Sequence, residues 1–174
     1  MMDIGEKIYN LCVELFPINR SLMGSGVEKT LNILKRENPR IEIKRIPTGT
    51  KCLDWEVPGE WIINDGFLKD PDGIKIVDYK KNNLQVITYS SPIDKKISLA
   101  DLKKNLFTLP NFPEAIPYIT SYYNENWGFC LSENQKLKLR DGIYHAFIDS
   151  EIKPGNLSYG ELFIPGSTKK EVFF

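Results

Sequence analysis

The chain has 174 residues and no net charge, because 23 basic residues balance 23 acidic ones. Hydrophobic residues make up 41% of the chain and charged residues 26%, which is typical of a globular protein with a substantial core. No basic stripe stands out, so nucleic acid is not expected as a partner. The sequence shows no secretory leader and no apolar run of the roughly 18 residues that span a membrane. We therefore expect a cytoplasmic protein with no membrane partner.

Residues 1–50 are predicted to form two helices and a strand. The apolar residues of the first helix recur at the spacing of one helix face. They are Ile4, Ile8, Leu11, Cys12 and Leu15. Ser25 and Glu28 have the S-x-x-E spacing of a capping box, which predicts the start of the second helix. Ile41 and Ile43 alternate with charged residues, as in a strand with one apolar side.

From about residue 51 the sequence becomes rich in turns, aromatic residues and short apolar runs. Strands are expected at residues 61–68, 74–79, 84–89 and 142–148. The turn Asp70-Pro71-Asp72-Gly73 joins the first two of these strands. Ser98 and Ser132 are predicted to cap two short helices. Residues 51–155 therefore form a β-rich unit that differs from residues 1–50.

The last residues return to apolar strands. One strand is predicted at residues 157–164 and another at 171–174, separated by Pro165-Gly166. We expect Gly160–Ile164 and Glu171–Phe174 to be adjacent core strands of one sheet. With helices in one part of the chain and strands in another, the fold class is predicted to be α+β.

Few residues in the chain are typical of catalysis. His145 is the only histidine, which excludes a zinc site with two or more histidine ligands within this chain, and its strand context favours a structural histidine over a catalytic base. Asp70, Asp72 and Asp78 surround a turn, which explains them better than a Ca²⁺ site does. Gly24-Ser25-Gly26 is typical of a helix start, and anion binding there is the less favoured alternative.

The three cysteines, Cys12, Cys52 and Cys130, are widely spaced. This spacing predicts free thiols at half-buried packing positions.

The segment from Pro117 to Cys130 is the strongest candidate for a binding surface. Its aromatic residues include Tyr122, Tyr123 and Trp127, and they alternate with Thr, Ser and Asn. Such a segment suits the recognition of a carbohydrate or protein partner. Core packing is the favoured interpretation, because about half of these side chains must point inward.

Several longer motifs resemble a bacterial family of zinc-aminopeptidase-like proteins, whose genes often lie beside those of polysaccharide biosynthesis. The motifs are LFPINRSLMG (15–24), IPTGT (46–50), DWEVP (54–58), AIPYITSYY (115–123), WGFCLS (127–132) and LSYGE (157–161). The resemblance extends from about Leu15 to Phe174, and thus over nearly the whole chain.

The resemblance implies a two-part architecture. Residues 1–50 would open an α/β aminopeptidase-like catalytic domain, residues 51–155 would be an inserted β-rich domain with short helices, and residues 156–174 would be return strands of the catalytic domain, cut short. A complete member is expected to bind zinc and to hydrolyse a peptide-like or amide substrate. The metal ligands are expected beyond Phe174, so this chain should bind no zinc and be inactive alone.

The remaining expectations concern surfaces. Tyr122, Tyr123, Trp127, Asn19 and Arg20 are expected to face a ligand or the cleft. An unpaired sheet edge would favour self-association. The alternative to a hydrolase fragment is a non-catalytic binding module that recognises a carbohydrate or protein through its aromatic segment.

Overall fold

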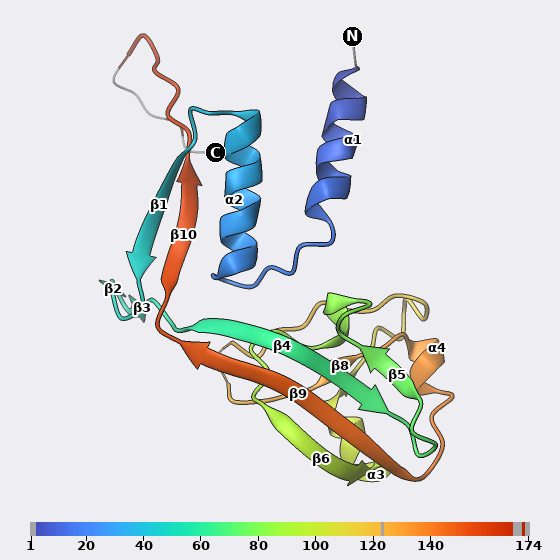
Figure 1. The fold of residues 1–174 in the computed structure, drawn as a ribbon. Helices are drawn as coiled ribbons and strands as arrows, with labels where there is room; N and C mark the ends of the chain where they lie inside the picture. Colours follow the sequence, from blue (N-terminus) through green and yellow to red (C-terminus); the bar gives the residue numbers. More distant parts are fainter. Residues whose placement is uncertain (1–2, 123, 169–171, 173–174) are drawn as a thin grey trace. The chain divides into compact units, whose positions relative to one another are not determined.

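The computed structural model describes residues 3–122, 124–168 and 172, and the chain divides into two compact units (Figure 1). Unit 1 comprises residues 1–58 and 154–174, and unit 2 comprises residues 59–153. From the sequence, these boundaries are predicted after residues 50 and 155. The fold class is α+β, as predicted. Among the described residues, no helix is long and apolar enough to cross a membrane.

Unit 1 contains two helices, a two-stranded sheet and a small hairpin. Its elements are α1 (Ile4–Leu15), α2 (Ser25–Glu37), β1 (Glu42–Pro47), β2 (Lys51–Cys52), β3 (Trp55–Glu56) and β10 (Asn156–Glu161). β1 pairs with β10 in antiparallel orientation, although more than a hundred residues separate them in the sequence. Both predicted helices and the first predicted strand are confirmed.

Glu28 does not form the predicted capping box. The N-cap of α2 is Gly24, with φ of 105°, Ser25 is the first helical residue, and no side chain caps the helix. Glu28 instead accepts hydrogen bonds from Nε and Nη2 of Arg45 on β1, at 2.7 and 2.6 Å. The hydroxyl of Ser158 on β10 also donates to Glu28. The carboxylate therefore joins α2 to both strands of the sheet.

The apolar face of α1 lies partly open to solvent. No residue of this helix is buried, and Ile4 and Ile8 are 70% and 58% exposed. A surface ion pair between Glu14 and Arg36 links α1 to α2. Within the described part of unit 1, Ile4 and Ile8 at the start of the stripe are not covered, whereas Leu11 and Leu15 at its end are half-buried.

The predicted strand at residues 157–164 ends early. β10 stops at Glu161, whose ladder partner Glu42 is the first residue of β1, so the chain beyond it has no neighbouring strand among the described residues. Leu162, Phe163 and Ile164 are exposed and outside any strand. The prediction of a core strand at Gly160–Ile164 is therefore wrong. Apart from Val172, which is exposed, the predicted strand at 171–174 lies outside the described residues.

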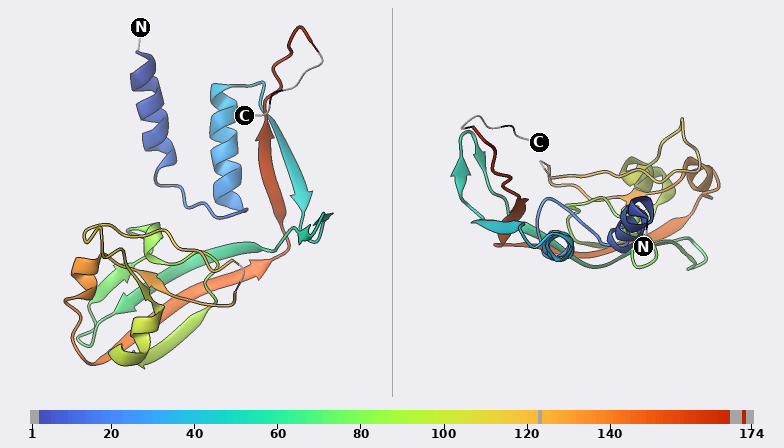
Figure 2. Two further views of the ribbon diagram at one scale, coloured as in Figure 1. Left: turned by 180° about the vertical axis from the view of Figure 1, so that it is seen from behind. Right: turned by 90° about the horizontal axis from the view of Figure 1, so that it is seen from above.

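Unit 2 is built on a four-stranded antiparallel sheet in the order β5-β4-β9-β6. The strands are β4 (Glu60–Lys69), β5 (Lys75–Asp78), β6 (Ile93–Ser98) and β9 (Ile143–Lys153). The smaller elements are η1 (Asn83–Gln85), α3 (Leu99–Leu102), η2 (Lys103–Asn105), β7 (Leu106–Phe107), β8 (Phe129–Cys130) and α4 (Glu133–Lys136). β4 and β9 are the long central strands (Figure 2). The short elements and loops pack on this sheet.

The core of unit 2 lies between one face of the sheet and the short elements. Along β9 the side chains of Tyr144, Ala146 and Ile148 are buried, whereas those between them are not, because successive side chains of a strand point to opposite faces. This buried face packs in one cluster with Leu102 and Phe129. Burial of each large apolar side chain in this cluster, such as Ile148, Leu102 or Phe129, stabilises the unit by about 1.5–3 kcal/mol.

The predicted strand at residues 84–89 is wrong. The segment begins with the 3-10 helix η1, and Val86 and Thr88 then form single bridges with Phe129 and Thr120. Val86 and Ile87 are buried, so their apolar character reflects a loop packed into the core. Tyr89 has φ of 62°, a left-handed conformation that interrupts an extended chain.

Both predicted helix caps of unit 2 are confirmed. Ser98 accepts a hydrogen bond from the amide of Asp101, and Ser132 forms a capping box with Gln135. The turn role of Asp70 is also confirmed, because its carboxylate accepts hydrogen bonds from the amides of Asp72 and Ile74.

The cysteines differ from the expectation in their burial. All three are free thiols, but Cys12 and Cys52 are exposed and Cys130 is fully buried. Burial raises the pKa of the Cys130 thiol to about 12.

Candidate functional site

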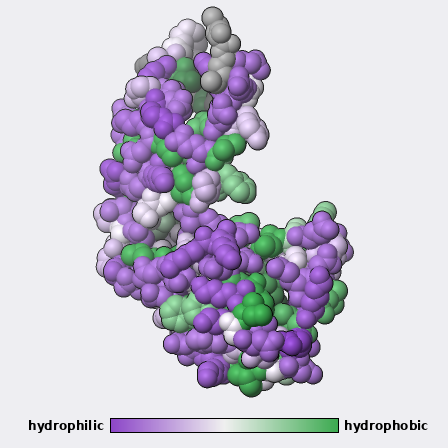
Figure 3. All heavy atoms as spheres, turned by 45° about the vertical axis from the view of Figure 1, so that its right-hand side comes forward, coloured by the Kyte–Doolittle hydropathy of each residue, from purple (hydrophilic) through white to green (hydrophobic). Residues whose placement is uncertain are grey.

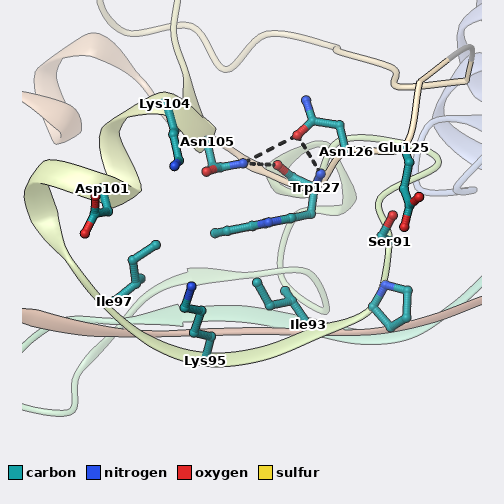
Figure 4. Close-up of a pocket in the computed structure, with 11 residues that line it drawn as sticks. Ser91, Ile93, Lys95, Ile97, Asp101, Lys104, Asn105, Glu125, Asn126 and Trp127 are labelled. Carbon is teal, nitrogen blue, oxygen red and sulfur yellow. Dashed lines mark hydrogen bonds between the residues drawn. The ribbon is translucent and has the colours of Figure 1, made fainter.

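The candidate site is a cavity of about 850 Å³ in unit 2, beside Trp127 (Figure 4). Two stretches of the sequence form its walls. One is residues 91–105, which contain β6 with the two residues before it and the helical turns α3 and η2, and the other is residues 125–127 ahead of β8. The cavity therefore depends on the tertiary fold of unit 2.

One wall of the cavity comes from β6, the edge strand of the sheet. Ile93, Lys95 and Ile97 line the cavity. They are alternate residues, so they share one face of the strand. Asp94 and Lys96 belong to the opposite face. The wall thus combines two aliphatic side chains with one ammonium group.

The opposite wall is Trp127, which is held firmly through its backbone. Its amide donates to Oδ1 of Asn126 at 2.8 Å, and its carbonyl accepts from Nδ2 of Asn105 at 2.7 Å. The indole meets the buried ring of Phe129 edge-to-face, with 6.2 Å between ring centroids. Figure 4 shows the indole edge-on, with Lys95 on one side of its plane and Asn105 on the other.

The residue after Trp127 must be small. A Cβ atom on Gly128 would lie 2.6 Å from the ring of Phe107 and 2.7 Å from the carbonyl oxygen of Asn105. Glycine therefore lets the loop approach η2 closely enough for the hydrogen bond between Asn105 and Trp127.

Asn105 has one hydrogen-bonding atom without a partner. The residue is only 6% exposed, and Nδ2 uses its hydrogens on the carbonyl of Trp127 and, at 3.5 Å, on Oδ1 of Asn126. Oδ1 is buried and accepts no hydrogen bond within the part of the chain that the structure describes. In Figure 4 this oxygen turns toward Lys104 and away from Asn126. A buried acceptor that stays unpaired costs stability.

Charges of both signs surround the cavity. Lys95 and Lys104 form no ion pair with any described residue. Asp101 accepts a hydrogen bond from the Ser98 hydroxyl at 2.8 Å, and Glu125 is exposed. Two ammonium groups and two carboxylates give the lining no net charge.

The predicted site residues of the aromatic segment have different surroundings. Trp127 lines the cavity. Tyr122 is half-buried, outside the lining, and its ring meets that of Tyr89 at 5.3 Å between centroids. Burial raises the pKa of Tyr89 to about 12, and its hydroxyl donates to the carbonyl of Gly59 at 3.2 Å. Tyr123 lies outside the described residues.

Asn19 and Arg20 belong to unit 1, in the loop between α1 and α2. Nη1 of Arg20 donates to the carbonyl of Leu15 at 2.7 Å. The backbone oxygen of Asn19 lies so close to Gly26 that a Cβ atom there would be 1.8 Å away. These contacts hold the loop against the start of α2, whereas neither side chain lines the cavity beside Trp127.

No sequence pattern indicated a role for Lys95, Lys104 or Asn105. The only signal for Lys95 is its position between two isoleucines in the alternating pattern of an edge strand. Lys104 and Asn105 follow a short capped helix and resemble ordinary surface residues in the sequence. Their approach to Trp127 follows from the packing of η2 against the loop before β8.

A zinc site does not fit the described residues. Nowhere among them do three or more His, Cys, Asp or Glu side chains gather closely enough to hold a metal ion. His145 is paired instead with Asp94 across β9 and β6, with 2.6 Å between Nε2 and Oδ1. Its ring also meets Phe67 edge-to-face.

Comparison with known proteins gives three similarities. Residues 60–151 match the model of a family described as "Domain of unknown function (DUF2172)". The chain is 46% identical over 170 residues to a Clostridium acetobutylicum protein named "Putative polysaccharide biosynthesis protein with aminopeptidase-like domain", and the aligned part is 98% of this chain and 39% of that protein. A crystal structure of a "putative peptidase" from Clostridium acetobutylicum superposes with a TM-score of 0.84 at 47% identity, over 90% of this chain and 37% of the other. The chain thus spans about two fifths of the relatives it matches.

Proposed function

This chain belongs to the DUF2172 family, and from that premise we propose that it is a non-catalytic part of a longer aminopeptidase-like hydrolase. The name of the C. acetobutylicum relative, which contains an aminopeptidase-like domain, supports this proposal. The similarity to a solved peptidase over most of this chain supports it as well.

The observation that carries the proposal is the exposed apolar surface of unit 1. On α1, Ile4 and Ile8 face solvent. So do the side chains of Leu162, Phe163 and Ile164, and Phe163 is 75% exposed. Hydrophobic residues also reach the surface in the space-filling view (Figure 3). Burial of each large apolar side chain would stabilise the protein by about 1.5–3 kcal/mol. Such a surface is therefore typical of one on which another domain packs. We propose that the remainder of the longer protein provides this cover.

The metal chemistry belongs to the longer protein in this proposal. Zinc would activate a water molecule for attack on a peptide-like or amide substrate. The described residues of this chain offer no ligand set for zinc, so no catalytic step is assigned to them. The role of unit 1 is to complete the fold around the catalytic centre.

The experiment compares the 174-residue chain with the product of the whole reading frame. Both are assayed for Zn²⁺-dependent release of p-nitroaniline from a set of amino-acid p-nitroanilides, with a chelator as control. The longer product should hydrolyse at least one substrate, whereas the 174-residue chain should hydrolyse none. Chelator-sensitive hydrolysis by the 174-residue chain, or a stop codon directly after codon 174 in the gene, would overturn the proposal.

A second candidate function is ligand binding by unit 2 without catalysis. The cavity beside Trp127 favours it, because an aromatic ring and several uncommitted polar groups converge there. This function is compatible with the first, since the cavity lies wholly within residues 59–153.

A further inference from the structure

We propose that the cavity beside Trp127 is a saccharide-binding site. This inference develops the second candidate function and is independent of hydrolase activity, so either can fail without the other. It depends on three features of the cavity, which are its aromatic wall, its balanced polar groups and its size.

The aromatic wall matches the apolar face of a sugar ring. A pyranose presents C–H groups on its faces and hydroxyl groups around its edge, and an indole offers a large, rigid, apolar surface for such a face. Trp127 is partly exposed and fixed by two backbone hydrogen bonds. Because its backbone is already ordered, little conformational entropy is lost when a ligand binds.

The polar groups of the lining match the edge of a sugar ring. Every hydroxyl group both donates and accepts, so its site needs both kinds of partner. Lys95 and Lys104 supply donors, while Asp101 and Glu125 supply acceptors. The lining carries no net charge, which favours a neutral ligand over a phosphate or polyanion.

The size of the cavity suits a small saccharide. At about 850 Å³, it falls within the range of roughly 300–1,000 Å³ typical of small-molecule sites. A peptide strand pairing with β6 is the competing occupant, because β6 has a free edge. The charged run Asp94-Lys95-Lys96 on this strand is typical of edges that resist such pairing. We therefore favour the saccharide and make the peptide an outcome of the test.

The test follows the indole N–H signals of the three tryptophans by ¹H–¹⁵N NMR in the 174-residue chain. The probes are glucose, N-acetylglucosamine, their β-1,4-linked disaccharides, glucuronic acid and a mixture of unstructured pentapeptides. A neutral saccharide should shift the signal of Trp127 in a saturable manner and leave that of Trp61, which is buried in the same unit, unchanged. Trp127→Phe assigns the signal.

Two neighbouring lysines give a matched pair of variants. Lys95→Ala should weaken binding by about 10-fold, the loss expected for one hydrogen bond to a charged group. Lys96→Ala lies on the opposite face of β6 and should leave binding unchanged. Both residues are exposed, so both variants should fold.

Three results would overturn the proposal. The first is the absence of a saturable shift with every saccharide. The second is equal weakening by Lys95→Ala and Lys96→Ala, which would place the ligand elsewhere. The third is a saturable shift of the Trp127 signal with the peptides and not with the saccharides, which would assign the cavity to peptide binding.

Discussion

Replacing Glu28 by glutamine should loosen the contact between α2 and the β1–β10 sheet. The carboxylate accepts two hydrogen bonds from Arg45 and one from Ser158, whose side chain is buried. Glutamine can still accept a hydrogen bond, but it loses the charge and one acceptor oxygen. The side chains of Arg45 and Glu28 are 50% and 28% exposed, so water screens much of the ion pair. We expect a loss of about 1–2 kcal/mol in the free energy of opening this sheet.

Hydrogen exchange measured by mass spectrometry on peptides covering β1 and β10 reports this loss directly. A change of about 1–2 kcal/mol corresponds to exchange roughly 5–30-fold faster in Glu28→Gln. Arg45→Met should have a similar effect, whereas peptides from unit 2 should exchange as before. The double variant should lose less than the sum of the two single losses, because both remove the same interaction.

Low pH should reproduce the effect of the substitution. The hydrogen bonds from Arg45, and then from Ser158, hold the pKa of Glu28 below its ordinary value of 4.5. The stabilisation is therefore fully present above pH 4.5 and is lost as the pH falls through the lower pKa of the folded state. The exchange rates of β1 and β10 in wild type and in Glu28→Gln should differ at pH 6. They should become equal at a pH below the pKa of Glu28 in the folded state.

Ser25→Ala distinguishes this contact from the helix cap expected from the sequence. In the structure the side chain of Ser25 makes no capping hydrogen bond. Its replacement should therefore change the exchange rate of the β1 and β10 peptides by less than about 2-fold. If Ser25→Ala accelerated exchange as much as Glu28→Gln, or if Arg45→Met had no effect, the reasoning would be refuted.

Four further outcomes are expected. Leu68→Ala, in the fully buried core of unit 2, should cost about 2–5 kcal/mol in urea denaturation, and a loss under 1 kcal/mol would contradict the assigned packing. Gly128→Ala should destabilise unit 2 by about 1–3 kcal/mol through its clash with the Asn105 carbonyl, whereas Gly166→Ala, with nothing within 4 Å, should be neutral in the same assay. At pH 8 a thiol reagent should label two cysteines quickly in the native chain and Cys130 only after denaturation, because the raised pKa keeps this buried thiol protonated; rapid labelling of all three would contradict its burial. The 174-residue chain should self-associate through its exposed apolar residues in static light scattering, and a monomer with one sharp melting transition would count against this.

Local sequence signals predicted the elements whose structure is decided locally. The turn at Asp70 and the caps at Ser98 and Ser132 were predicted correctly, because a side chain there bonds to a backbone group only two to four residues away. The central strands β4 and β9 were found from apolar runs, although β9 continues to Lys153, beyond the apolar run.

The errors arose where tertiary contacts decide the structure. Glu28 has the spacing of a capping residue, but Arg45 and Ser158 come from strands that only the fold brings to it. Val86 and Ile87 belong to a loop that packs into the core. In the sequence, such a buried apolar pair cannot be distinguished from part of a strand. The candidate site shows the same limit. The aromatic segment indicated Trp127 as a site residue, but no local sequence pattern connected Trp127 with Lys95 or Asn105.

The chain enters and leaves unit 2 at neighbouring points. β4 begins at Glu60 and β9 ends at Lys153, and these two residues face each other in the antiparallel ladder. On the other side of the boundary, the amide of Thr48 donates to the carbonyl of Gly155. A segment of 95 residues whose ends adjoin can be gained, lost or exchanged in a single genetic event, because the host chain needs only a short link to close the gap. The ligand specificity of such a segment can therefore diverge while the host fold stays the same.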